Sequence, residues 1–431
     1  MEQFFKLNQH GTTVKREMVA GLTTFLTMAY ILAVNPAMLG SIGSGMTPQA
    51  VFTATVVSSA IAMVIMAFAA NLPIALAPGM GLNAFFTFTV VGQMGYSWQM
   101  ALTAVFLEGI LFVILSLLNV REAIIKAIPG SLKQAVAVGI GLFIALIGFE
   151  NSGIIVGNPA TLIALGDINK GTALVAALGL VIMIILYVLR VPGSILIGIL
   201  VTAVIGIPLG VTKIPEGFSP FSLPAAPLVW QFDFSNILTL KFFTVFFTFL
   251  FVDIFDTVGT LVGVTTQAGL ITKEGEIPQV KQALFADAVG TVAGAVLGTS
   301  TVTSYVESAS GVAAGGRTGL TALTTAVLFL LALFFSPLFL LIPSAATAPA
   351  LVMVGFFMMK SVMGIDFSDP TEGIPAFLAI AMMPFAYSVS EGIVYGVLAY
   401  VVCKTVLRRW KDISVITWIL FAVFLLRIIF K

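Results

Sequence analysis

The chain of 431 residues is 59% hydrophobic and only 9% charged, with a mean hydropathy of +1.12. Soluble globular proteins carry about 25% charged residues, so most of this surface must face lipid. The net charge of +1 argues against a nucleic-acid or polyanion partner, and the single cysteine, Cys403, excludes an internal disulfide. The composition therefore predicts an all-α polytopic protein embedded in a lipid bilayer.

The first fifteen residues, MEQFFKLNQHGTTVK, are polar and lack the apolar core of a signal peptide, so we expect the first span to be retained. Apolar stretches of about 20 residues, the length that crosses a bilayer, follow along the chain. Before a Pro-rich loop they lie at 16–38, 49–71, 72–95, 98–118, 132–150, 171–189 and 192–212. After that loop they lie at 238–265, 282–298, 299–316, 318–337, 345–362, 373–387 and 390–407. The sequence thus predicts about 14 spans, and the last apolar stretch, 412–430, is either a further span or an interfacial helix.

Basic residues predict the orientation, because Lys and Arg prefer cytoplasmic loops. With a cytoplasmic N-terminus, most of them fall on the inner side: Lys15, Arg16, Arg121, Lys126, Lys133, Arg190, Lys273, Lys281, Arg317 and Lys360. Lys170 and Lys213 are exceptions in long loops, where the rule is weak. The basic cluster at 404–411 falls inside only if the chain turns near 387–392, which is why 373–407 is divided into two spans. We therefore expect a multi-pass protein of the cell membrane with its N-terminus in the cytoplasm.

Two spans are interrupted by residues that disfavour a regular helix. In LPIALAPGMGLNAFF, Pro78 favours extended chain at Ala77, two glycines follow, and Asn83 adds an amide. In GTSTVTSYVESASG, the β-branched polar run 299–303 also favours extended chain. The interruptions lie at matching positions in two halves of seven spans. This layout is typical of an inverted-repeat transporter with a binding site at the bilayer midplane.

The second interruption ends in a carboxylate. Ser304 and Glu307 have the spacing of a capping box, which predicts a helix that starts at Ser304 with Glu307 in its first turn. Main-chain groups left free at such a junction are tolerated in a membrane only where they line a cavity. The small residues in 309–316 predict close helix packing. The alternative is that Glu307 only caps a helix end near the surface.

The apolar run FFTFLFVDIFDTVGT, residues 246–260, contains Asp253 and Asp256 on one helical face. A carboxylate in a bilayer core costs a few kcal/mol on insertion scales, and two so close are not expected to be ionised together. This favours proton coupling, the alternative being structural carboxylates bonded by hydroxyls of a neighbouring helix. For the intramembrane acids Glu108 and Asp287, a structural and a relay role are equally open, whereas Glu391 is better explained as a helix cap.

Enzymatic chemistry finds no support in the sequence. His10, the only histidine, lies in the polar leader, and the sequence has no Cys/His cluster, so we expect no metal and no cofactor. The glycine-rich GVAAGGRTG lacks the phosphate-loop pattern. An intramembrane aspartyl protease would need its two aspartates on different helices. Among other transport proteins, an anion carrier of the same fold would need basic residues or bare helix N-termini at its site, whereas this site is acidic. A channel would not need paired broken helices.

Four stretches carry a resemblance that covers nearly the whole chain: GLTTFLTMAYILAVNP, APGMGLNAFF, FVDIFDTVGTLVG and TSYVESASGVAAGGRTGLTA. Together they resemble the azaguanine/hypoxanthine-permease-like branch of the nucleobase–cation symporters. The resemblance implies the uracil-permease-like fold, a 7+7 inverted repeat whose third and tenth spans are each half strand and half helix. It also implies a core domain at 14–119 and 236–337, a gate domain at 120–235 and 338–431, and a homodimer.

The same resemblance implies proton-coupled import of a purine base, guanine or hypoxanthine, by alternating access. An adenine-specific permease is the alternative, and proton versus sodium coupling stays open. By motif position Asp253 and Glu307 bind the base, and Asp256 matches a further polar position of this branch. We expect Asp256 either to tune the pKa of its neighbour or to relay the proton, with Asp253 and Glu307 also taking part in proton coupling. Further contacts with the base are expected from Asn83, Tyr305 and Val306. Uracil-type members have a histidine where this chain has Asp-Ile-Phe-Asp-Thr, so the resemblance does not define the proton path here.

Overall fold

The computed structural model describes residues 2–41, 45–117, 129–235, 237–270, 277 and 279–429. Three of the basic residues used above, Arg121, Lys126 and Lys273, lie outside the described residues, as does the predicted domain boundary between residues 119 and 120. All other predicted spans and site residues can be placed.

The first half of the described chain follows the predicted order of spans. Its helices are α1 (Val14–Met28), α2 (Ile31–Gly40), α3 (Pro48–Ile65), α4 (Met80–Ala84), α5 (Trp98–Leu117), α7 (Gly130–Asn151), α8 (Gly171–Val188) and α9 (Ser194–Gly206). Short π-helical segments, Met66–Ala70 and Phe85–Gln93, extend α3 and α4. The strands are β1 (Leu76–Pro78), β2 (Ile155–Asn158) and β3 (Leu162–Leu165).

The second half of the described chain also consists mainly of helices. Its helices are α10 (Leu240–Gln267), α11 (Val280–Leu297), α12 (Ser308–Ala313), α13 (Gly319–Ala332), α14 (Ser336–Leu340), α15 (Ser344–Met358), α16 (Pro370–Phe385), α17 (Val389–Val406) and α18 (Val415–Ile429), with one strand, β4 (Val302–Ser304). The predicted turn that divides 373–407 is confirmed, because α16 ends at Phe385 and α17 begins at Val389.

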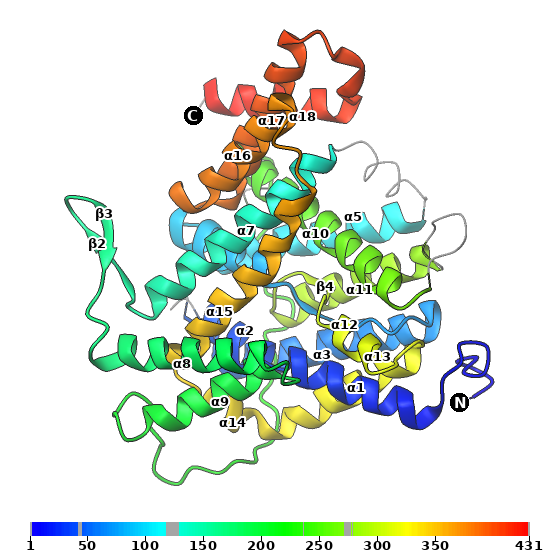
Figure 1. Cartoon of the computed structure of the whole chain (residues 1–431), viewed down its shortest axis with the longest axis vertical. Coiled ribbons are helices and arrows are strands. Elements are labelled where there is room, and N and C mark those ends of the chain that lie inside the picture. Colours follow the sequence, from blue (N-terminus) through cyan, green and yellow to red (C-terminus); the bar gives the residue numbers. More distant parts are fainter. Residues whose placement is uncertain are drawn as a thin grey trace.

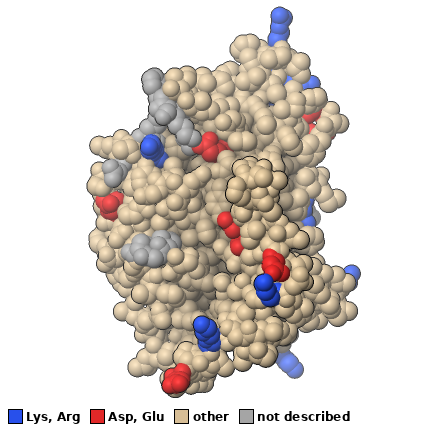
Figure 2. All heavy atoms as spheres, turned by 90° about the vertical axis from the view of Figure 1, so that its left-hand side faces the viewer, with Lys and Arg blue, Asp and Glu red and all other residues tan. Residues whose placement is uncertain are grey.

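Within the described residues, ten helical segments are long and apolar enough to cross a membrane. The chain is therefore a multi-pass helical membrane protein. Helix α18 has 15 residues and is about 22 Å long at the rise of an α-helix, which is short for a hydrocarbon core of about 30 Å. Charged side chains are few and scattered on the face that Figure 2 shows.

The helices form two groups that pack mainly within themselves. One contains α1, α3, α5, α10, α11, α12 and α13, and the other contains α7, α8, α9, α15, α16 and α17. In Figure 1, α7, α15 and α16 run diagonally across the upper part of the molecule, while α1, α3 and α13 lie at the lower right and β4 lies near the centre. We call the set that contains α1 and α10 the first helix group, and the set that contains α7 and α15 the second helix group.

An ion pair between a buried lysine and a partly exposed glutamate ties the second group together. Lys404 of α17 is only 3% exposed, and its Nζ lies 2.5 Å from Glu372 Oε1 of α16. Ser131, in the first turn of α7, donates a hydrogen bond to the same carboxylate. Because a buried charge is costly without its partner, this contact fixes the start of α7 against α16 and α17.

In the first group, small residues bring α1 and α12 into close contact, as predicted for 309–316. A Cβ added at Gly311 would lie 2.0 Å from Thr24 Oγ1 and 2.8 Å from the carbonyl oxygen of Ala20. The carboxylate of Glu17 on α1 also accepts hydrogen bonds from the main-chain N–H groups of Arg317 and Thr318, just before α13. Helix α1 is therefore held against the segment that follows β4.

Two features differ from the predictions. The hairpin β2–β3, which follows α7, was not expected, because its apolar strands are too short to be read as a span. It projects from the molecule in Figure 1. The capping box at Ser304 is wrong, because Ser304 belongs to strand β4 and the helix begins only at Ser308. Pairing of β4 with β1 holds Ser304 in extended chain, so Glu307 takes the N-cap position of α12 instead.

Gly311→Ala should destabilise the protein by about 1–3 kcal/mol, the usual cost of overpacking, because the new methyl group collides with α1. The melting temperature of the detergent-solubilised protein would measure this. Gly263→Ala on α10 is the matched control, since a Cβ there meets nothing within 4 Å. Equal melting temperatures for both variants would contradict the close α1–α12 packing.

Candidate functional site

The site is built around two short strands from opposite halves of the chain. Strands β1 and β4 pair antiparallel, with Leu76 opposite Ser304 and Pro78 opposite Val302. Beyond the ladder, the Gly79 N–H donates to the Thr301 carbonyl oxygen at 3.0 Å, and the Tyr305 N–H donates to that of Ala75 at 2.9 Å. The two predicted interruptions are thus one structure, in which each extended segment satisfies the backbone of the other inside the membrane.

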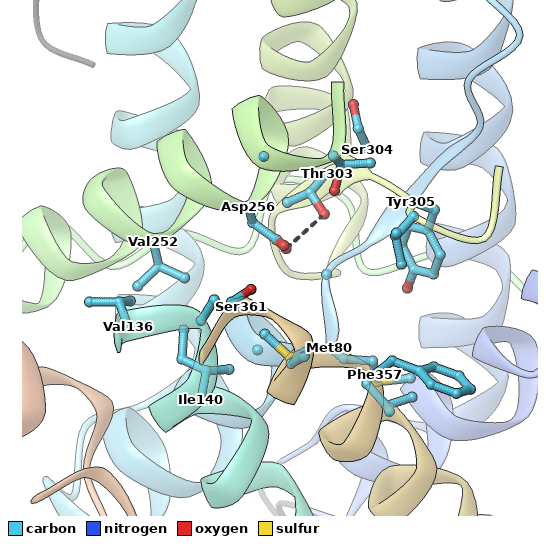
Figure 3. Close-up of a pocket in the computed structure, with 18 of the residues that line it drawn as sticks. Met80, Val136, Ile140, Val252, Asp256, Thr303, Ser304, Tyr305, Phe357 and Ser361 are labelled. Atoms are coloured by element: carbon cyan, nitrogen blue, oxygen red, sulfur yellow. Dashed lines mark hydrogen bonds between the residues drawn. The ribbon is translucent and has the colours of Figure 1, made fainter. Parts of the chain in front are cut away.

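A cavity of about 540 Å³ lies beside this strand pair. In the first helix group, α10 and the segments around β1 and β4 form one wall of the cavity. In the second helix group, α7 and the 354–361 segment form the opposite wall. Figure 3 shows Asp256 and Thr303 facing each other, with Ile140, Met80 and Ser361 across the cavity. The cavity therefore lies between the two helix groups.

Asp256 is the carboxylate that α10 presents to the cavity. The Thr303 hydroxyl donates to Asp256 Oδ2 at 3.4 Å, a long hydrogen bond that leaves acceptor capacity on the carboxylate. Gly79 allows this approach, because a Cβ at that position would lie 2.9 Å from Thr303 Oγ1 and 3.5 Å from Asp256 Oδ2.

Glu307 is the second carboxylate in the cavity wall. The phenol of Tyr30 donates to Glu307 Oε1 at 2.6 Å. Tyr30 also lines the cavity and is 1% exposed. One oxygen of Glu307 is thus held by the protein, while the carboxylate as a whole borders the cavity.

Tyr305 and Val306, both predicted as contacts, line the same cavity. Tyr305 is 5% exposed and its hydroxyl donates to the Pro78 carbonyl oxygen at 2.5 Å. Val306 is more than half exposed and presents an apolar surface to the cavity.

Asp253 and Asn83 are placed differently: neither is among the described residues that line the cavity. Asp253 is fully buried, and the Thr257 hydroxyl lies 3.3 Å from its Oδ1 and 2.7 Å from Oδ1 of Asp287 on α11. Asn83 Oδ1 accepts a hydrogen bond from the Ser300 hydroxyl. Both residues belong to a buried polar layer behind the strand pair.

Glu108 belongs to the same layer. It is fully buried on α5, and its Oε2 accepts a hydrogen bond from the Thr301 hydroxyl at 3.1 Å. Glu391, by contrast, lies in the first turn of α17, where its N–H donates to the side chain of the N-cap residue Ser388. The cap at this helix start is therefore Ser388, and Glu391 follows it in the first turn.

The opposite wall carries polar groups that sequence reasoning missed. Gln134 and Ser361 line the cavity, and Gln134 Oε1 has no hydrogen-bond partner among the described residues. Tyr30 was also missed, although it lies inside the quoted stretch GLTTFLTMAYILAVNP. A tyrosine in an apolar span was the available signal, but its neighbour, Glu307, is 277 residues away in sequence.

In the part of the chain that the structure describes, no group of three or more His, Cys, Asp or Glu side chains is arranged to hold a metal ion. What the arrangement offers is hydrogen-bond acceptors in a largely apolar cavity between two helix groups. This suits reversible binding of a small polar molecule.

The paired broken spans and the cavity between two helix groups define the class of a secondary transporter. The model of the Permease family (Xan_ur_permease) matches residues 15–407, and the chain belongs to this family. Its relatives are transporters, so it is a permease and not an enzyme.

Similar curated proteins cover the whole chain. It is 47% identical to the guanine/hypoxanthine permease PbuG of Bacillus subtilis, with 100% of both chains covered. It is 44% identical to the adenine permease AdeQ of Escherichia coli, with 100% of this chain and 96% of the relative covered. A putative permease of Methanocaldococcus jannaschii is 48% identical over 100% of this chain and 98% of its own length.

Solved structures with the same fold are more distant. The transmembrane domain of a cyanobacterial bicarbonate transporter, BicA, superposes with a TM-score of 0.65 at 15% identity, covering 89% of this chain and 97% of that one. SLC26A9 gives a TM-score of 0.59 at 12% identity, covering 90% and 65%. This likeness concerns the fold alone.

Water access to the cavity can be tested with single cysteines after Cys403→Ala. Ala137→Cys should react quickly with a charged, water-soluble thiol reagent, because Ala137 lines the cavity. Ala288→Cys on α11 should stay unlabelled, because that position is fully buried elsewhere. Labelling would be followed by a gel shift, and equal labelling at both positions would contradict the cavity.

Proposed function

We propose that this protein imports a purine base, guanine or hypoxanthine, by proton-coupled symport with alternating access. The observation that carries the proposal is the presence of two carboxylates, Asp256 and Glu307, in one cavity beside the crossing strands. The guanine/hypoxanthine permease activity of a relative that matches over its full length supports it.

The chemistry of the base fits these acceptors. Guanine presents N1–H and a 2-amino group on one edge, and a carboxylate accepts both hydrogen bonds at once. Hypoxanthine offers N1–H without the amino group. Apolar and aromatic side chains such as Met80 and Phe357 line the same cavity and can cover the ring faces.

We assign the base-holding role to Asp256 and Glu307, which is a change from the motif-based expectation for Asp253. The support is geometric, because Asp256 borders the cavity whereas Asp253 is turned toward Thr257 and Asp287. Asp253 then takes the proton-coupling role, one helical turn from the base. Asn83, through Ser300, supports the strand pair behind the site.

The wider architecture is part of the proposal. We infer a 7+7 inverted repeat of 14 spans, with the first helix group as the core domain (14–119 and 236–337) and the second as the gate domain (120–235 and 338–431). The step in sequence from Val14 to Leu240, the starts of α1 and α10, equals the step from Leu76 to Val302, the starts of β1 and β4. This equality supports the repeat.

The proposed setting is the cell membrane, with a cytoplasmic N-terminus and a homodimer as the assembly. Lys133 and Lys360, which the positive-inside rule assigns to the cytoplasm, both line the cavity. The cavity would therefore open inward in this conformation, and the crossing strands would move with the core relative to the gate.

Adenine import is the second candidate. Adenine presents an unprotonated N1 beside its 6-amino group, so this edge of the base needs a donor and an acceptor side by side in the protein. The amide of Gln134 on the gate wall has both, and the relative AdeQ is an adenine permease. An anion carrier of this fold is disfavoured by the two carboxylates in the cavity.

Uptake of labelled guanine, hypoxanthine, adenine, xanthine and uracil by cells without their own base transporters tests the proposal. Uptake of guanine and hypoxanthine should saturate and should collapse with a proton uncoupler. Competition among the bases separates the two candidates, because adenine should compete weakly if guanine is the substrate. Absence of uptake of every base would overturn the proposal.

Asp256→Asn and Glu307→Gln should each raise KM by about 10-fold or more, because a hydrogen bond to a charged group is worth about 1.5–3 kcal/mol. Asp253→Asn should instead lower the uncoupler-sensitive rate with a smaller change in KM. Asp366→Asn, in the exposed turn before α16, is the control. A normal KM in Asp256→Asn with a raised KM in Asp253→Asn would reverse the assigned roles.

A further inference from the structure

Tyr30 joins the two halves of the chain at the candidate site. Its phenol donates to Glu307 Oε1 at 2.6 Å, which lies within the range of hydrogen bonds from a hydroxyl to a carboxylate. Tyr30 is 1% exposed and lines the cavity. Neither the motif pattern nor its apolar surroundings assign it a role.

A break in the first span makes this contact. Helix α1 ends at Met28 and α2 begins at Ile31, so Tyr30 lies at the junction, where it is the N-cap residue of α2. One turn earlier, the Thr27 hydroxyl lies 3.5 Å from the main-chain carbonyl oxygen of Glu307. The end of α1 therefore contacts both the main chain and the side chain of Glu307.

The close packing of α1 on α12 fixes the distance between these groups. Thr24 of α1 occupies the space that a side chain at Gly311 would need. Glu307 immediately precedes α12. The packing therefore sets the main chain at Glu307 beside the end of α1, where the Tyr30 hydroxyl donates to Oε1 of the carboxylate.

The two halves place polar groups at the same point of their first spans. The step from Tyr30 to Asp256 equals the step from Val14 to Leu240. Both side chains line the cavity. The half that contributes Asp256 offers the ligand an acceptor, whereas the half that contributes Tyr30 offers its hydroxyl to Glu307.

We propose that Tyr30 is a positioning residue for base binding, which holds Oε1 of Glu307 so that Oε2 is presented to the N–H edge of the base. The proposal rests on the proposed function of Glu307. A side chain with one oxygen fixed has lost rotamer freedom before the ligand arrives, so less is lost on binding. Tyr30 itself need not touch the base.

A double-mutant cycle on uptake tests this inference. Tyr30→Phe, which removes only the hydroxyl, should raise KM for the base by roughly 10-fold, the size expected for a lost hydrogen bond to a charged group, with a much smaller change in the maximal rate. In the Glu307→Ala background, which has no acceptor for the Tyr30 hydroxyl, Tyr30→Phe should change KM by less than about 2-fold, because the two residues act as a unit.

Tyr395→Phe on α17 is the matched control, since Tyr395 is 39% exposed and does not line the cavity. Thermal melting of each purified variant separates binding from folding. If Tyr30→Phe does not fold, Tyr30→Met, which also lacks a hydrogen-bond donor, replaces it and should raise KM by the same roughly 10-fold.

The outcomes distinguish the two levels of the account. A raised KM in Glu307→Gln with a normal KM in Tyr30→Phe would overturn the role of Tyr30 and leave the proposed function standing. Independent, additive effects of Tyr30→Phe and Glu307→Ala on KM would overturn the role of Tyr30 as well. A normal KM in Glu307→Gln would overturn the proposed function itself.

Discussion

The structure depends on one constraint: main-chain groups inside a bilayer must find partners within the protein. Strands β1 and β4 are each three residues long, and neither could exist there alone. Their antiparallel pairing satisfies both, and the contacts of Gly79 with Thr301 and of Tyr305 with Ala75 continue it. Each half of the chain therefore completes the other at the centre of the molecule.

The candidate site follows from that pairing. The strand pair places Thr303 beside Asp256 and ends just before Glu307, so that two carboxylates border one cavity. The buried layer behind it, with Asp287 and Glu108, bonds to hydroxyls of α10 and of the β4 segment. Buried polar groups are thus gathered around the two broken spans.

Local sequence signals predicted much of this fold. Pro78 and the β-branched run 299–303 act on their own backbone, so both interruptions could be predicted without tertiary information. Span positions followed from hydropathy for the same reason. The start of the helix at Ser304 could not be predicted in this way, because a strand partner more than two hundred residues away decides its conformation.

The site itself was only partly predictable, since it depends on helix rotation. Asp253 and Asp256 are about 60° apart around a helix axis, and the packing of α10 against α5, α12 and β4 decides which of them borders the cavity. The place of Tyr30 in the site depends on the break between α1 and α2 and on its contact with Glu307, which is distant in sequence. The hairpin β2–β3 pairs two apolar strands that lack the length of a span.

A structure of the protein with bound guanine tests the central claim most directly. The account predicts the base in the cavity beside β1 and β4, with its N1–H and 2-amino edge on one of the two carboxylates, Asp256 or Glu307. A base bound outside this cavity, or one whose N–H edge contacts Asp253 instead, would contradict it.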